Sequence, residues 1–178
     1  MSQNLVLTVI GAAVGVGLVA VIAYQVARFM RGSITLSLRR GAFNPGDTIT
    51  GRCELHTKKA IHGNQLSVSL IGVQVTTSYN GGKQRTRSRE IYRNEVLLEE
   101  GKAYPAGHTA GYDFQLVVPN ANAPEFLDSP LGQTLSTALR LLSNRDSQLK
   151  WKVEARLDAQ GVDLAAAQSV SINTGQWL

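Results

Sequence analysis

The sequence lacks the residues for a disulfide framework, because it contains a single cysteine, Cys53, among 178 residues. A lone thiol excludes an internal disulfide and favours a reducing compartment. No Asn-X-Ser/Thr acceptor for glycosylation occurs. The net charge of +5 is mild. It favours contact with anionic surfaces but does not by itself predict nucleic-acid binding.

Charge is also missing from the first part of the chain, where no Asp, Glu, Lys or Arg precedes Arg28. Residues 5–27 are almost wholly apolar, and as a helix they would extend about 34 Å, enough for a hydrocarbon core of about 30 Å. Tyr24 is placed where an interfacial aromatic residue is expected, and Arg28 and Arg31 close the segment. The sequence predicts a single transmembrane helix, with residues 1–32 forming an anchor and a short tether.

The charges beside this segment predict its orientation. Arg28, Arg31, Arg39 and Arg40 follow the segment and no cation precedes it. The positive-inside rule then places the N-terminus outside and the C-terminal domain in the cytoplasm, at an inner or plasma membrane. A cleaved signal peptide fits less well, because its apolar run would be shorter and would follow a positive charge.

The glycines of the apolar segment allow two interpretations. Residues 15–20 spell G-x-G-x-x-A, the phosphate-binding turn of dinucleotide-binding enzymes, but residues 33–43 lack the acidic residue that would bind the ribose. A dinucleotide-binding enzyme therefore stays only a residual alternative. Gly11 with Gly15, and Ala13 with Gly17, give the small-xxx-small spacing that lets a second helix approach closely. Simple tolerance of lipid explains these residues equally well.

Residues 33–178 have the period-2 alternation of β-strands. The expected strands are residues 34–38, 48–55, 66–75, 112–118, 151–157 and 162–172. A phase slip at Ile71-Gly72 predicts a bulge. Turn sequences such as NPGD, YNGG and AQG separate the strands. The pattern predicts a mainly β fold, an antiparallel sandwich with one inserted helix at about residues 129–143, capped by Asp128 or Ser129.

The same stretch resembles the arrestin family. Pro45-Gly46-Asp47, Ile49 and Gly51 match a P-G-[DE]-x-[IV]-x-G pattern, and Leu70 and Gly72 match a strand that ends in L-x-G. Residues 112–126 and 149–172 resemble later segments of the family in the correct order. The resemblance covers residues 33–173 and implies one sandwich of the arrestin N-terminal type, whereas arrestins and the related retromer subunits have two. It implies a binding or scaffolding role and no reaction.

Residues with catalytic potential are scattered. His56, His62 and His108 lack partners at metal-ligand spacing, and surface positions are expected for them. Cys53 shares the inward phase of its strand and is expected to be a buried core thiol. Glu99-Glu100 precedes Gly101 and is interpreted as a solvated turn. We therefore expect no catalytic, metal or cofactor site and no small-molecule substrate.

One charged pattern stands out. Lys83, Arg85, Arg87 and Arg89, named the basic row below, occupy every second position. On a strand they would project from one face. Such a row is suited to contact with anionic lipid or an acidic partner, or it could protect a sheet edge from pairing with other strands.

These features together predict a non-catalytic, membrane-anchored module. The expected role is an accessory subunit that stabilises a larger integral membrane protein complex from its cytoplasmic face, with complex subunits and membrane lipids as partners. The alternative is a free-standing membrane-tethered adaptor that recruits soluble proteins or receptor tails.

Overall fold

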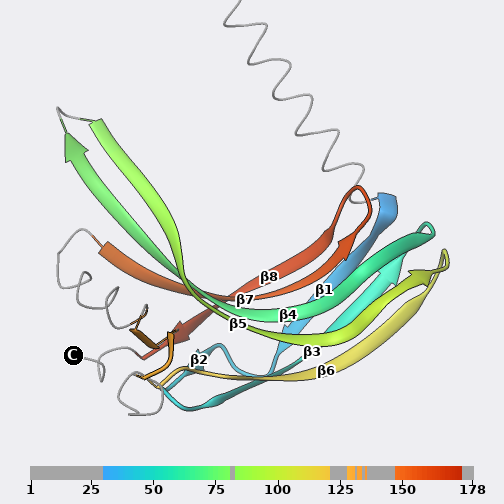
Figure 1. Cartoon of the computed structure of the whole chain (residues 1–178), viewed down its shortest axis with the longest axis horizontal. Helices are drawn as coiled ribbons and strands as arrows, with labels where there is room; N and C mark the ends of the chain where they lie inside the picture. Colours follow the sequence, from blue (N-terminus) through green and yellow to red (C-terminus); the bar gives the residue numbers. More distant parts are fainter. Residues whose placement is uncertain are drawn as a thin grey trace, which may run out of the picture.

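Two β-sheets form the described part of the protein (Figure 1). The computed structural model describes residues 30–80, 83–120, 128–130, 132–133, 135 and 147–173. Its strands are β1 (Gly32–Leu38), β2 (Ala42–Phe43), β3 (Thr48–Thr57), β4 (Ile61–Asn80), β5 (Lys83–Tyr104), β6 (Thr109–Val117), β7 (Ser147–Ala159) and β8 (Leu164–Ile172). One sheet has the order β1-β3-β6 and the other has the order β2-β8-β7-β4-β5.

Antiparallel pairing joins the strands of each sheet, with one exception. The two residues of β2 pair in parallel with Ser171 and Ile172 of β8. All other described ladders are antiparallel, and the longest joins β4 and β5 from Ile61↔Tyr104 to Asn80↔Lys83. The mainly antiparallel sandwich predicted from the alternation is therefore present.

The core lies between the two sheets and uses the inward phase predicted for most strands. On the larger sheet Leu66, Val68 and Leu70 are fully buried, and on the smaller sheet Cys53 and Leu55 are fully buried. Side chains on alternate positions share one face of a strand, so each run seals one side of the core. Burial of Cys53 confirms its predicted place, and burial together with the nearby Glu54 carboxylate raises the pKa of its thiol to about 11.

A bulge lies beside the phase slip, but on the neighbouring strand and not within residues 66–75 as predicted, because β4 keeps its register with β7 there. The register between β4 and β5 shifts between Gly72 and Val73, and the extra residue is Ile91 of β5. A second shift between Leu66 and Ser67 leaves Leu98 of β5 without a partner position. Bulges of this kind bend a strand and increase its twist. Both bulges lie on β5, so this strand does not keep one inward phase along its length.

Two glycines are required by close packing. A Cβ on Gly51 would lie 2.6 Å from the Phe114 ring and from the Ser37 carbonyl oxygen, and a Cβ on Gly72 would lie 2.9 Å from the Trp151 ring. The Pro45-Gly46 turn is also as predicted, since Gly46 has a positive φ and the Asp47 amide donates to the Asn44 carbonyl at 3.1 Å.

The predicted fold, a transmembrane helix followed by a sandwich with one inserted helix, is wrong as a description of this structure. None of the described helical residues belongs to a helix long and apolar enough to cross a membrane. The described chain instead enters the sheet at once, because Gly32 already pairs with Thr57. Residues 5–27, the basis of the transmembrane prediction, lie outside the described residues.

Only part of the predicted 129–143 helix lies within the described residues. Pro130, Gly132, Gln133 and Leu135 are helical, and the Gly132 amide donates to the Ser129 hydroxyl at 3.0 Å. Ser129 therefore caps this turn. Leu135 is fully buried in the core, so the described turn packs against the sandwich.

Candidate functional site

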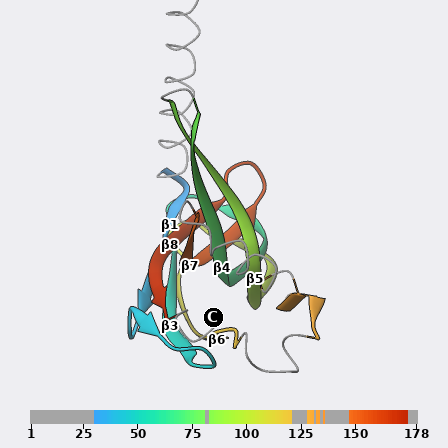
Figure 2. The same ribbon diagram turned by 90° about the vertical axis from the view of Figure 1, so that its left-hand side faces the viewer.

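The most distinctive surface is the far end of the β4–β5 ladder, which projects beyond the rest of the sandwich (Figures 1 and 2). We name residues 73–80 of β4 and 83–90 of β5 the basic hairpin. Among the described residues, β7 pairs with β4 only as far as Thr76, and residues 77–80 of β4 pair with β5 alone. In the described part of the chain the end of the hairpin is therefore a two-stranded ribbon.

Strand register places the basic row on one face of this ribbon. Lys83 lies opposite Asn80, Arg85 opposite Ser78, Arg87 opposite Thr76 and Arg89 opposite Gln74. Side chains that are directly opposite in an antiparallel pair share a face, and alternate residues along a strand do as well. The four cations thus form a line on a face whose other side chains are neutral.

No described acidic group neutralises the basic row. All four residues are exposed. The salt bridges among the described residues use five other cations instead: Arg52, Arg93, Lys102, Lys152 and Arg156. Successive members of the row are about 7 Å apart along the strand, within a Debye length of about 8 Å at physiological ionic strength. Their fields therefore add, which makes this ribbon a concentrated positive surface.

An aromatic side chain accompanies the cations near the end of the ribbon. Tyr79 is 72% exposed and pairs with Gln84, so it lies on the face opposite the basic row. Val73 and Val75 share that face and are partly buried. Sequence reasoning missed Tyr79 because its exposure depends on the hairpin extending past β7.

The position of β5 keeps the second interpretation of the basic row open. β5 is the last strand of the larger sheet, so one of its edges has no neighbouring strand in that sheet. Cations on an edge strand hinder pairing with strands of other molecules. Edge protection and contact with an anionic partner therefore both fit the geometry, and their consequences on substitution differ.

Further along β5, the Glu99 side chain connects the two sheets. The prediction that Glu99 lies in a solvated turn is wrong. Its carboxylate accepts hydrogen bonds from Tyr104 at 2.9 Å and from Tyr112 of β6, and it forms an ion pair with Lys102. Burial raises the pKa of Glu99, but the hydrogen bonds from Lys102 and the two tyrosines outweigh it and hold the pKa below its ordinary value. Burial, followed by the bonds to Glu99, raises the pKa of both tyrosines.

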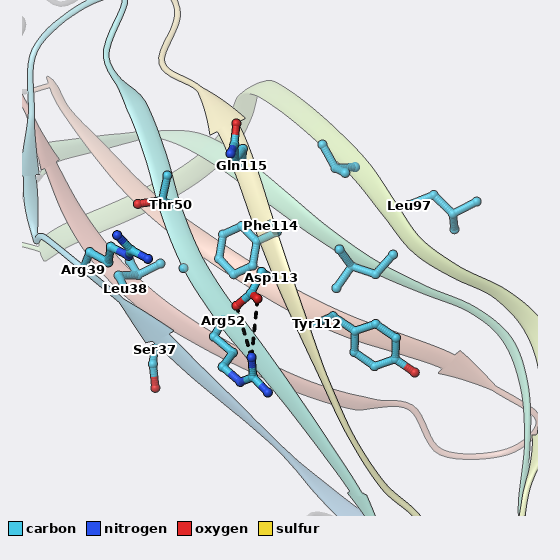
Figure 3. Close-up of a pocket in the computed structure, with 13 residues that line it drawn as sticks. Ser37, Leu38, Arg39, Thr50, Arg52, Leu97, Tyr112, Asp113, Phe114 and Gln115 are labelled. Carbon is cyan, nitrogen blue, oxygen red and sulfur yellow. Dashed lines mark hydrogen bonds and ion pairs between the residues drawn. The ribbon is translucent and has the colours of Figure 1, made fainter.

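A groove of about 980 Å³ lies beside this contact (Figure 3). Residues of β1, β3, β5 and β6 line it, including Leu38, Leu97, Tyr112 and Phe114. Arg52 and Asp113 form an ion pair at 3.3 Å on its wall. The lining has no pair of groups placed for proton transfer or nucleophilic attack. Sequence reasoning did not find the groove, because its residues come from four separate strands.

The remaining predicted residues are distributed as follows. Arg31 donates from Nη1 to the Val162 carbonyl at 2.9 Å, which fixes the start of β1 to the β7–β8 turn. His56 and His62 are exposed as predicted, whereas His108 is partly buried against the Tyr104 ring.

Within the described residues no group of three or more His, Cys, Asp or Glu side chains could hold a metal ion. The helix-packing residues Gly11, Ala13, Gly15 and Gly17, and the flanking residues Tyr24 and Arg28, lie outside the described residues.

Comparison with known proteins supports the fold and leaves the function open. The sequence matches no known family and no curated protein. The structure is similar to the crystal structure of Spo0M, a sporulation control protein from Bacillus subtilis, with a TM-score of 0.54 and 12% sequence identity. The match covers 80% of this chain and 49% of Spo0M, so this chain corresponds to about half of that protein. The chain has an arrestin-like β-sandwich, and at this identity the likeness shows the fold alone.

Proposed function

We propose that this chain is a non-catalytic binding module that acts at the cytoplasmic face of a membrane, as an accessory subunit of a larger integral membrane protein complex. The basic hairpin is the observation that carries the proposal. It presents four cations on one exposed face, and no described acidic residue forms an ion pair with them. A surface of this kind attracts an anionic partner over distances near the Debye length.

The proposed membrane location rests on the composition of residues 5–27 and on the cations that follow them. The start of the sandwich is consistent with a close attachment. β1 begins at Gly32, and Arg31 is hydrogen-bonded to the β7–β8 turn. Little free chain therefore separates residue 30 from the folded domain.

The proposed absence of a reaction rests on how the ionisable groups are used. Cys53 is buried, and its raised pKa keeps the thiol protonated at neutral pH. Glu99 is held by two tyrosines and a lysine and has a structural role. Asp163 is held by Arg156 and by the Ala159 amide. These contacts stabilise strands and turns, which favours a binding module over an enzyme.

Purification of the tagged full-length protein from native membranes in mild detergent tests this function. We expect stoichiometric co-migration with a large membrane complex on a native gel. Raising salt should release the native protein from that complex, whereas a variant with the whole basic row changed to Gln should bind weakly already at low salt and respond little to added salt. A lone monomer or dimer would favour the adaptor alternative, and recovery in the soluble fraction would contradict the membrane location.

A further inference from the structure

The direction in which the basic hairpin projects suggests what it contacts. The outer ends of β4 and β5, the start of β1 and the β7–β8 turn all lie in the upper part of both views, the first two at the left of Figure 1 and the others at its right (Figures 1 and 2). The described chain begins at Met30, beside the start of β1. A flat surface that lies along this side of the molecule, near residue 30, would also face the end of the hairpin.

We propose that the basic hairpin docks end-first on an anionic phospholipid bilayer, with Tyr79 in the headgroup region and Lys83 and Arg85 on lipid phosphates. This inference rests on the proposed membrane location and names the partner of the hairpin. Tyrosine at a membrane–water interface keeps its ring in the apolar part and its hydroxyl in water, while lysine and arginine bind phosphate.

The two faces of the hairpin favour the end-first arrangement over a flat one. Tyr79 and the basic row lie on opposite faces of the ribbon. If the hairpin lay flat on its cationic face, Tyr79 would point away from the bilayer. If the hairpin points its closed end at the surface, Tyr79, Lys83 and Arg85 all reach the headgroups together. The exposed tyrosine and the cations near it then serve one contact.

End-first docking predicts a gradient along the basic row. Arg89 is six residues from Lys83, a distance of about 20 Å along an extended strand. That distance exceeds a Debye length of about 8 Å, so Arg87 and Arg89 should feel the bilayer charge weakly. The outer pair, Lys83 and Arg85, and the inner pair, Arg87 and Arg89, carry the same charge on the same face. Each pair is therefore the control for the other.

The test uses the full-length chain reconstituted with phosphatidylcholine vesicles, with or without phosphatidylserine. A polarity-sensitive fluorophore is attached to Gln84→Cys, an exposed position beside Tyr79. The native thiol does not compete for the label, because Cys53 is buried and has a raised pKa. We expect a blue shift of the emission only with phosphatidylserine, and its reversal by high salt. Circular dichroism confirms that each variant is folded.

Substitution of the outer pair by Gln should lower the ratio of docked to undocked hairpin about 30-fold, since each cation near an anionic leaflet contributes about fivefold. Substitution of the inner pair should lower it by no more than about threefold. Tyr79→Ala should also reduce the blue shift while leaving the fold intact, because its side chain is largely exposed.

The possible failures are distinguishable. A chain that floats with both kinds of vesicle but whose emission ignores phosphatidylserine would overturn the lipid contact and leave the proposed function standing, with an acidic protein as the partner. A chain that floats with neither vesicle would overturn the membrane location itself. Equal effects of the outer and inner pairs would overturn end-first docking. Self-association of the outer-pair variant without any change in docking would assign the row to edge protection.

Discussion

Tyr112→Phe should weaken the contact between the two sheets and so lower the stability of the protein. The Tyr112 hydroxyl of β6 donates to Glu99 of β5, and this bond links the edge of the smaller sheet to the edge of the larger one. The Glu99 side chain is only 22% exposed, so water replaces the lost donor poorly. A hydrogen bond to a charged group contributes about 1.5–3 kcal/mol to stability.

This loss should appear as a lower melting temperature. For a domain of this size about 1 kcal/mol corresponds to about 2–4 °C, so Tyr112→Phe should lower Tm by about 3–12 °C. Thermal unfolding of the purified protein, followed by circular dichroism at neutral pH, measures the shift. Tyr79→Phe is the matched control, because the same atom is removed from a side chain that is 72% exposed. An equal effect of both substitutions, or no effect of Tyr112→Phe, would refute the role given to Glu99.

The pH dependence of stability supplies a second readout of the same contact. Glu99 has a lowered pKa in the folded protein, so its contribution is present above the ordinary carboxyl pKa and is lost as pH falls through the lower, folded value. Glu99→Gln should therefore cost stability at neutral pH and flatten the acid-side loss. Glu90 and Asp163 also have lowered pKa values, so part of the acid-side loss should remain in this variant.

Three further outcomes are expected. Gly72→Ala should destabilise the protein by about 1–3 kcal/mol in urea unfolding, because its Cβ would contact the Trp151 ring, whereas Gly41→Ala, with open space around it, should not. Cys53 should stay unmodified by a thiol reagent in the folded protein and react fully in urea; rapid reaction in buffer would contradict its burial. Changing the whole basic row to Gln should alter the unfolding free energy by no more than about 0.5 kcal/mol, and a larger loss would mean that the row supports the fold.

The alternation of apolar and polar residues along the chain predicted most of the fold. Leu66, Val68 and Leu70 predicted one strand correctly, whereas the bulge predicted from the phase slip after them lies on β5 instead. The strand signal is local, because side-chain direction alternates along any strand. The turn at Gly46 was equally local, since glycine adopts its positive φ without strain.

β5 shows why other elements escaped prediction. Its two bulges, at Ile91 and Leu98, interrupt the period-2 pattern twice. Glu99, Glu100 and Gly101 have the composition of a turn, yet they lie within the strand. Glu99 stays in place because Tyr104 and, from the next strand, Tyr112 donate to it, and the composition of residues 99–101 does not show these contacts. The parallel pairing of β2 with β8 likewise depends on residues more than a hundred positions apart.

The basic row was visible in the sequence, but the reason for its prominence was not. Alternation along a strand is enough to place its members on one face. The reasons lie in the tertiary structure. The hairpin extends past β7, the described salt bridges use other cations, and Tyr79 is exposed. The segment predicted to be a transmembrane helix lies outside the described residues. The helix-packing role of Gly11 and Gly15 therefore stays a prediction from the sequence.

Site-specific photo-crosslinking in native cells tests the central claim most directly, with a photoreactive residue at Thr86 of the basic hairpin and, as a control, at Gly41. Both sites are exposed, and Gly41 lies next to β2, at the opposite edge of the same sheet. The account predicts adducts with membrane lipids or membrane-complex subunits from Thr86 that disappear when the basic row is changed to Gln, and few from Gly41. Equal labelling from both sites, or labelling from Thr86 that persists without the cations, would contradict it.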